Sequence, residues 1–174
     1  MAYTRYYADI DGRRQRVPSV TSIMSKGLAW NKDGLLWWAN QAGLEGLTLD
    51  DARKKATDVG SIVHSMLEAD VRGLPQPDLG ALPEDMRTQC NTSFEAWTRW
   101  KDRYQFTVIA AEHSLVSNEW GFGGTFDLAF MDKRRSLLDF KTSKAYYPDM
   151  AVQIAAYGRL WDEHNPCLIL VKPL

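Results

Sequence analysis

Two aspartates and a lysine stand inside the stretches of this sequence that are otherwise built to be buried. Asp127 lies in "GTFDLAFM" and Asp139 in "SLLDFKT", where Lys141 follows two residues later. Both stretches have the length and composition of strands, and a short charged turn around Lys133 separates them. Acids in such strands require an explanation, because burying an unpaired charge is costly.

The hairpin that these strands predict sets the two acids against each other. If its turn is centred on Lys133, Asp127 pairs directly with Asp139, with Cβ atoms roughly 4.5–5.5 Å apart. Facing carboxylates repel unless one is protonated or a cation lies between them. A bound Mg²⁺ or Mn²⁺ explains the facing acids better than a proton does, since both ions bind carboxylates, water and phosphate. Strand alternation puts Lys141 on the face of Asp139, where a phosphate would arrive.

A simpler interpretation of the same three residues stays open. Asp127 and Asp139 could be solvated on the open face of a sheet, with Lys141 as their salt-bridge partner. Two acids and a lysine at loose spacing occur by chance in many proteins, so surrounding elements must decide.

The first half of the chain predicts a hairpin followed by helices. Asp11-Gly12 separates "YTRYYADI" from "RRQRV", which is typical of a tight turn. The four arginines of this hairpin could together contact phosphates, although each alone is typical of a solvated edge strand. Helices are expected over "PSVTSIMSKG", ending at Gly27, and over "NKDGLLWWANQAG", whose tryptophans we expect in the core: Trp30, Trp37 and Trp38.

Two longer helices are expected next. One begins at Thr48, which forms a capping box with Asp51, and runs to Gly73. The loop "GLPQPDLGALP" leads to the other, which follows Pro83 and carries an aromatic stripe expected to be buried: Phe94, Trp97, Trp100 and Tyr104.

The second half of the chain predicts a sheet. Three consecutive strands, "FTVIAAEHSLV", "GTFDLAFM" and "SLLDFKT", precede a helix over "PDMAVQIAAYGRLWDEH" and a last strand, "CLILV". This order predicts an α/β fold with a mixed central β-sheet flanked by helices. The 174 residues are expected to form a single domain, mainly helical over 1–105, with the sheet and its helix over 106–174.

Composition limits the possible classes of protein. With 21 basic and 22 acidic residues the formal charge is −1, so a polyanion must be held by local patches. Two cysteines, Cys90 and Cys167, are too few for a disulfide framework or for a four-thiolate zinc or iron–sulfur site. No run approaches the ~20 apolar residues of a membrane span, and the N-terminus lacks the apolar core of a signal peptide. We therefore expect a cytoplasmic protein without a membrane partner.

The stretch from Gly121 to Tyr157 resembles the PD-(D/E)XK nuclease superfamily. An acid follows a glycine on one strand, Asp127 after Gly124, and "DFK" matches the (D/E)-x-K element. The closest likeness is to the RecB-like and lambda-exonuclease-like branch, which includes the mitochondrial genome maintenance exonuclease. Its Q-x-x-x-Y element matches Gln153 and Tyr157, and "GSIVHSMLE" resembles its helix with a metal-binding histidine.

The resemblance implies a restriction-endonuclease-like αβββαβ core with an N-terminal helical extension. It implies that Mg²⁺ or Mn²⁺ is held by His64, Asp127, Asp139 and the backbone carbonyl of Phe140, without an iron–sulfur cluster. Lys141 would orient the attacking water, and Gln153 and Tyr157 would position the nucleic-acid backbone or support Lys141. We expect Glu68 to be a solvated neighbour of the histidine. Glu112 matches a glutamate often seen on the first strand, in a ligand, structural or supporting role.

By the same resemblance, the expected function is metal-dependent hydrolysis of DNA, single- or double-stranded, by an exonuclease of phage or bacterial recombination or repair. Two alternatives remain: a structure- or sequence-specific endonuclease, and a non-catalytic nucleic-acid-binding or inhibitory module on the same fold. The complete set of Asp127, Asp139 and Lys141 favours an enzyme.

Overall fold

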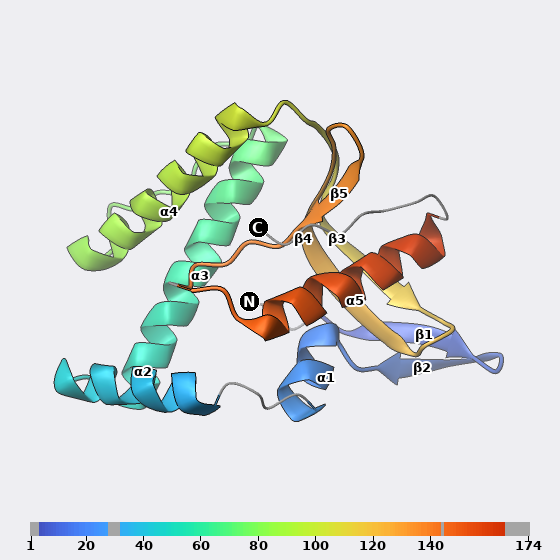
Figure 1. The fold of residues 1–174 in the computed structure, drawn as a ribbon, viewed down its shortest axis with the longest axis horizontal. Helices are drawn as coiled ribbons and strands as arrows, with labels where there is room; N and C mark the ends of the chain where they lie inside the picture. Colours follow the sequence, from blue (N-terminus) through green and yellow to red (C-terminus); the bar gives the residue numbers. More distant parts are fainter. Residues whose placement is uncertain (1–3, 28–31, 144, 166–174) are drawn as a thin grey trace. The chain divides into compact units, whose positions relative to one another are not determined.

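The computed structural model describes residues 4–27, 32–143 and 145–165. Over these ranges the chain is an α/β protein with five helices and two small antiparallel sheets (Figure 1). It divides into two compact units. The sheet unit contains the described residues of 1–30, 106–139 and 146–174, and the helical unit those of 31–105 and 140–145. In the described ranges no helix is long and apolar enough to cross a membrane.

The sheet unit begins with the predicted hairpin. Strand β1 (Tyr6–Ile10) pairs antiparallel with β2 (Arg13–Val17) around a two-residue turn. Both turn residues have positive φ, 52° at Asp11 and 72° at Gly12, which is the geometry of a type I′ turn. Aspartate and glycine tolerate this region, so the sequence favours the turn locally. The prediction of a hairpin is confirmed.

The larger sheet has the order β3 (Thr107–Ser117), β4 (Phe122–Met131) and β5 (Arg135–Leu138). Both pairings are antiparallel. Helix α5 (Pro148–His164) has the predicted bounds, starts with a proline in its first turn and packs across all three strands (Figure 1). Buried side chains fill the space between this helix, the sheet and α1 (Val20–Gly27): Val20, Phe126, Leu137, Ile154, Leu160 and Trp161.

Two glycines of β4 let other elements approach its backbone closely. A Cβ at Gly123 would lie 2.5 Å from Tyr6 Cδ1, and one at Gly124 would lie 2.6 Å from Tyr157 Cε1. No real side chain fits at such distances without displacing its neighbour. The glycines therefore set how closely the hairpin and α5 pack onto β4.

The helical unit contains α2 (Lys32–Leu44), α3 (Leu49–Arg72) and α4 (Glu84–Arg103). The caps of α3 are those predicted. Thr48 Oγ1 accepts a hydrogen bond of 3.1 Å from the Asp51 amide, and Gly73 ends the helix in the left-handed region, at φ 66°. Such caps satisfy backbone groups that a helix terminus otherwise leaves without partners.

Helices α3 and α4 pack against each other along their apolar faces. Trp97 is buried there, and its indole donates a 2.7 Å hydrogen bond to Asp70 on α3, which also accepts one from Lys101. Trp97 stacks on Trp100 at 5.4 Å. The predicted burial holds for Trp97, whereas Tyr104 at the end of the stripe is exposed.

Several predictions differ from the structure. Trp37, predicted as core, is 65% exposed on α2, because this short helix presents apolar residues on more than the one face that packs. The predicted strand "SLLDFKT" ends at Leu138 instead of continuing to Thr142. Described strand pairs within the sheets are antiparallel, so a mixed sheet is not seen, and the predicted strand "CLILV" and Trp30 lie outside the described residues.

Candidate metal centre

The predicted register between β4 and β5 is confirmed. Leu128 pairs with Leu138 and Met131 with Arg135, so the turn is centred on Lys133. The ladder ends at Leu138, one residue before the predicted pair of Asp127 and Asp139, so the sheet itself does not pair these two acids. Asp127 is 7% exposed, an unusual burial for an ionisable side chain in the middle of a sheet.

A third acid reaches Asp127 from the other neighbouring strand. Ala111 pairs with Leu128 and His113 with Phe126, which leaves Glu112 of β3 opposite Asp127. A carboxylate oxygen of Glu112 and one of Asp127 lie within 4.8 Å of each other. Two acids at this distance, one of them buried, are compatible when a cation or a proton offsets their repulsion.

Glu112 also has a strained backbone. Its φ is 47°, inside a strand whose neighbours are extended, and a residue other than glycine seldom adopts this conformation. The strain costs of the order of 1–3 kcal/mol and is typical of functional sites. The sequence alone does not reveal the role of Glu112, because a positive φ within a strand leaves no local pattern. The available signal was the register, which places position 112 beside Asp127.

Helix α5 brings an amide and a phenol to Asp139. Gln153 and Tyr157 stand one turn apart, so both side chains lie on the same helix face. Gln153 Nε2 donates a 2.8 Å hydrogen bond to the Tyr157 hydroxyl and a longer one, 3.4 Å, to Asp139 Oδ1. The Q-x-x-x-Y element therefore contacts Asp139, which lies just after the end of β5.

Tyr157 stays protonated throughout the physiological range. Burial raises the pKa of its hydroxyl far above the ordinary 10.0; the Gln153 hydrogen bond lowers the pKa in part, and the negative charges of Asp139 and Asp127 add smaller increases. A neutral phenol at this position can donate a hydrogen bond to an anionic oxygen.

His64 and Phe140 meet in the helical unit. His64 Nε2 lies 3.1 Å from the Phe140 carbonyl oxygen, and the two rings make an edge contact at 6.0 Å. The Trp97 ring also makes an edge contact with the Phe140 ring, with the ring centroids 5.2 Å apart. The structure therefore brings together two of the predicted metal ligands. Glu68 forms an ion pair with Arg72 at 3.1 Å, one helical turn away, and its side chain is partly exposed.

Lys141 differs from its prediction. It lies beyond the end of β5, in a segment without strand structure, and it is exposed. Strand alternation therefore does not set its direction relative to Asp139. The argument from alternation was wrong because the ladder to β4 stops at Leu138.

No protein-family model and no curated protein matched this chain when it was compared with them. In the sheet unit a carboxylate oxygen of Glu112 and one of Asp127 lie within 4.8 Å of each other, and Asp139, just after β5, accepts a hydrogen bond from Gln153. Carboxylate oxygens are ligands for hard divalent cations such as Mg²⁺, Mn²⁺ or Ca²⁺.

Proposed function

We propose that this protein is a metal-dependent nuclease that hydrolyses phosphodiester bonds of DNA. The observation that carries the proposal is the approach of a Glu112 carboxylate oxygen to one of Asp127 within 4.8 Å on neighbouring strands, with Asp139 directly after the end of β5. Asp127 is buried, and Glu112 has a strained backbone of the kind found at functional sites. A bound cation would offset the repulsion between their carboxylates.

The carboxylates of Asp127, Asp139 and Glu112 are the proposed ligands from the sheet unit. Bound Mg²⁺ or Mn²⁺ would lower the pKa of a coordinated water and offset charge on the scissile phosphate. His64 and the Phe140 carbonyl are proposed as further ligands on the resemblance, and in the helical unit the two groups are hydrogen-bonded to each other at 3.1 Å. Phe140 also follows Asp139 directly in the chain.

Gln153, Tyr157 and Lys141 have supporting roles in the proposed mechanism. Gln153 holds the Asp139 carboxylate and the Tyr157 hydroxyl in fixed relation, so that the phenol is free to face a phosphate oxygen. Lys141 follows Asp139 by two residues and is exposed, and its positive charge would neutralise the phosphate and orient the attacking water. An exposed ammonium can do this without a fixed strand position.

An exonuclease of recombination or repair is the proposed form of the activity. It is supported by the resemblance of "DFK", the Q-x-x-x-Y element and the histidine helix to the RecB-like branch of the PD-(D/E)XK superfamily. An endonuclease on the same core is the second candidate. The complete set of Asp127, Asp139 and Lys141 weighs against a module without catalysis, which has no need of all three residues.

The test uses end-labelled linear DNA and covalently closed circular DNA, each with Mg²⁺ or Mn²⁺. We expect shortening of linear DNA, intact circles and no reaction in EDTA. Asp139→Asn should abolish cleavage, and Asp132→Asn, which removes an acid from the β4–β5 turn, should not. Cleaved circles would favour the endonuclease, and undiminished cleavage by Asp139→Asn would refute the assignment.

A further inference from the structure

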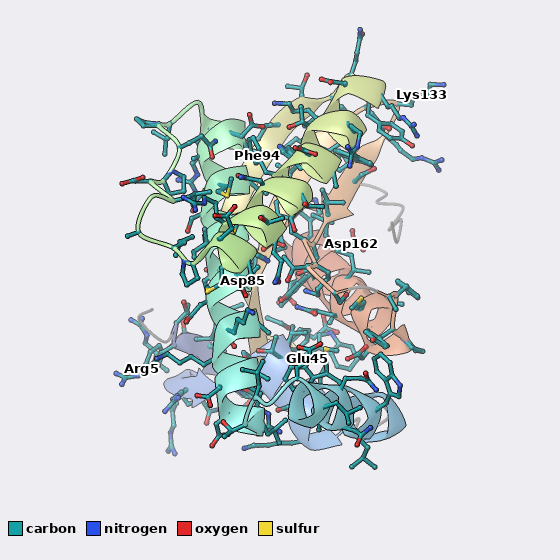
Figure 2. The ribbon with its side chains drawn as sticks, turned by 90° about the vertical axis from the view of Figure 1, so that its left-hand side faces the viewer. Arg5, Glu45, Asp85, Phe94, Lys133 and Asp162 are labelled. Atoms are coloured by element: carbon teal, nitrogen blue, oxygen red, sulfur yellow. The ribbon has the colours of Figure 1, made fainter. Side chains whose placement is uncertain are left out.

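The outer face of the N-terminal hairpin is strongly basic. Residues 4–17 contain four arginines and two aspartates, whereas the whole chain has a formal charge of −1. Arg14 and Arg16 of β2 and Arg5, just before β1, are exposed on this face together with Asp9, which pairs with Arg14, whereas Arg13 is exposed on the face of Val17. In Figure 2 the side chain of Arg5 extends away from the ribbon. Across the described chain, none of the four arginines forms an ion pair.

An aromatic ring lies among these charges. Tyr7 pairs with Arg16 across the hairpin and remains 44% exposed, and the guanidinium of Arg14 lies 5.4 Å from the centre of its ring. Side chains alternate along a strand, so Tyr7 points away from the buried Tyr6 and Ala8. Guanidinium groups beside an exposed ring combine phosphate contacts with a surface on which bases can stack.

The hairpin is firmly attached to the strand that carries Asp127. The Tyr6 hydroxyl lies 2.8 Å from Thr125 Oγ1, two residues before Asp127, and the Gly123 amide donates a 3.0 Å hydrogen bond to the Pro18 carbonyl. Tyr6, Ala8 and Val17 form a buried cluster beneath the hairpin. The basic outer face is therefore a fixed surface of the sheet unit and not a loose tail.

We propose that the outer face of the β1–β2 hairpin binds single-stranded DNA, with Arg5, Arg14 and Arg16 on phosphates and Tyr7 beneath a base. The inference rests on the proposed nuclease function, to which it adds a place where substrate is held. Charge complementarity identifies a polyanion, and the exposed ring beside Arg14 identifies unpaired bases, since bases stacked in a duplex offer no face to a side chain.

The experiment measures binding without cleavage. Fluorescence anisotropy of a labelled 20-nucleotide single strand is recorded in EDTA at 50 and 200 mM salt. Arg14→Gln/Arg16→Gln is compared with Lys133→Gln/Arg134→Gln, which removes two charges from the exposed turn of the other hairpin; Figure 2 shows Lys133 extending from that turn. Far-UV circular dichroism and thermal melting of each variant verify its fold.

We expect the β2 variant to bind about tenfold or more weakly at 50 mM salt, with the slope of log affinity against log salt reduced by about 1.4 for two lost single-strand phosphate contacts. Arg14→Lys/Arg16→Lys should keep the slope. Tyr7→Ala should weaken single-strand binding about fivefold or more and duplex binding less.

Equal affinity of wild type and the β2 variant overturns the inference, as does an equal loss in the Lys133/Arg134 variant or a wild type that does not bind. Poly-L-glutamate that binds as tightly as the oligonucleotide overturns it as well, in favour of an acidic protein partner. A wild type that binds through Arg14 and Arg16 but cleaves nothing upholds the surface and refutes the nuclease. A wild type that cleaves while the β2 variant binds and cleaves equally well refutes the surface alone.

Discussion

The carboxylates of Glu112 and Asp127 approach each other from neighbouring strands, with an oxygen of each within 4.8 Å. One is buried in the sheet, and the other belongs to a residue with a left-handed backbone in the middle of a strand. The left-handed backbone at Glu112 lowers stability, and substitutions at position 112 can measure this strain. The proposed cation would offset the repulsion between the two carboxylates.

The protein should be more stable with glycine than with alanine at position 112. In an ordinary strand alanine is favoured by roughly 0.5–1 kcal/mol. At φ 47° the order reverses, because only glycine lacks the Cβ that makes this conformation costly. We expect the free energy of unfolding, measured by urea denaturation, to be about 1 kcal/mol higher for Glu112→Gly than for Glu112→Ala. The usual order, with alanine more stable, would show that the strand is extended at this position in solution.

Gly124→Ala should destabilise the sheet unit. The added Cβ would lie 2.6 Å from Tyr157 Cε1, so α5 has to move away from β4 or Tyr157 has to leave its rotamer. Overpacking of this kind costs about 1–3 kcal/mol. The control is Gly43→Ala on α2, where no atom lies within 4 Å and alanine favours the helix by about 0.5–1 kcal/mol. Similar urea midpoints for both variants would contradict the close packing of α5 on β4.

Tyr157 should make stability fall at high pH. Its folded pKa is raised above the ordinary 10.0 by burial and by Asp139 and Asp127. The folded protein therefore retains a proton that the unfolded chain releases, and the free energy of unfolding decreases as pH rises above about 10, by up to ~1.4 kcal/mol per pH unit. Urea denaturation of wild type and Tyr157→Phe between pH 9 and 11 isolates this contribution as the difference in slope. Parallel curves would mean that Tyr157 ionises normally.

Gln153→Ala should impair catalysis without unfolding the protein. The amide bridges Asp139 and Tyr157, and loss of a group that orients a metal ligand typically lowers affinity or activity about 10–100-fold. We expect kcat to fall within this range and the Mn²⁺ concentration for half-maximal activity to rise, with an unchanged melting temperature. Arg159→Gln, exposed on the same helix, is the control. A variant with normal metal dependence would assign Gln153 a purely structural role.

Local signals in the sequence predicted much of the fold. Asp11-Gly12 specified the turn of the hairpin, Thr48 and Gly73 the ends of α3, and Pro148 the start of α5. The register of Leu128 with Leu138 followed from the length of the turn. Each of these features depends on residues close together in the chain, which is why a pattern could reveal it.

Features that depend on distant partners were missed. The end of β5 at Leu138 reflects where its ladder with β4 stops, and no breaker residue marks this point. Exposure of Trp37 depends on what covers α2, although its composition is that of a core segment. The backbone of Glu112 and its closeness to Asp127 are set by the strand opposite, so the sequence indicated two sheet acids where the structure brings a third.

Isothermal titration with Mn²⁺, in the absence of nucleic acid, tests the central claim most directly. The account predicts that wild type binds Mn²⁺, that Asp127→Asn and Glu112→Gln each weaken the affinity about tenfold or more, and that Asp132→Asn on the β4–β5 turn leaves it unchanged. A wild type without measurable Mn²⁺ binding, or an Asp127→Asn variant that binds as tightly as wild type, would contradict it.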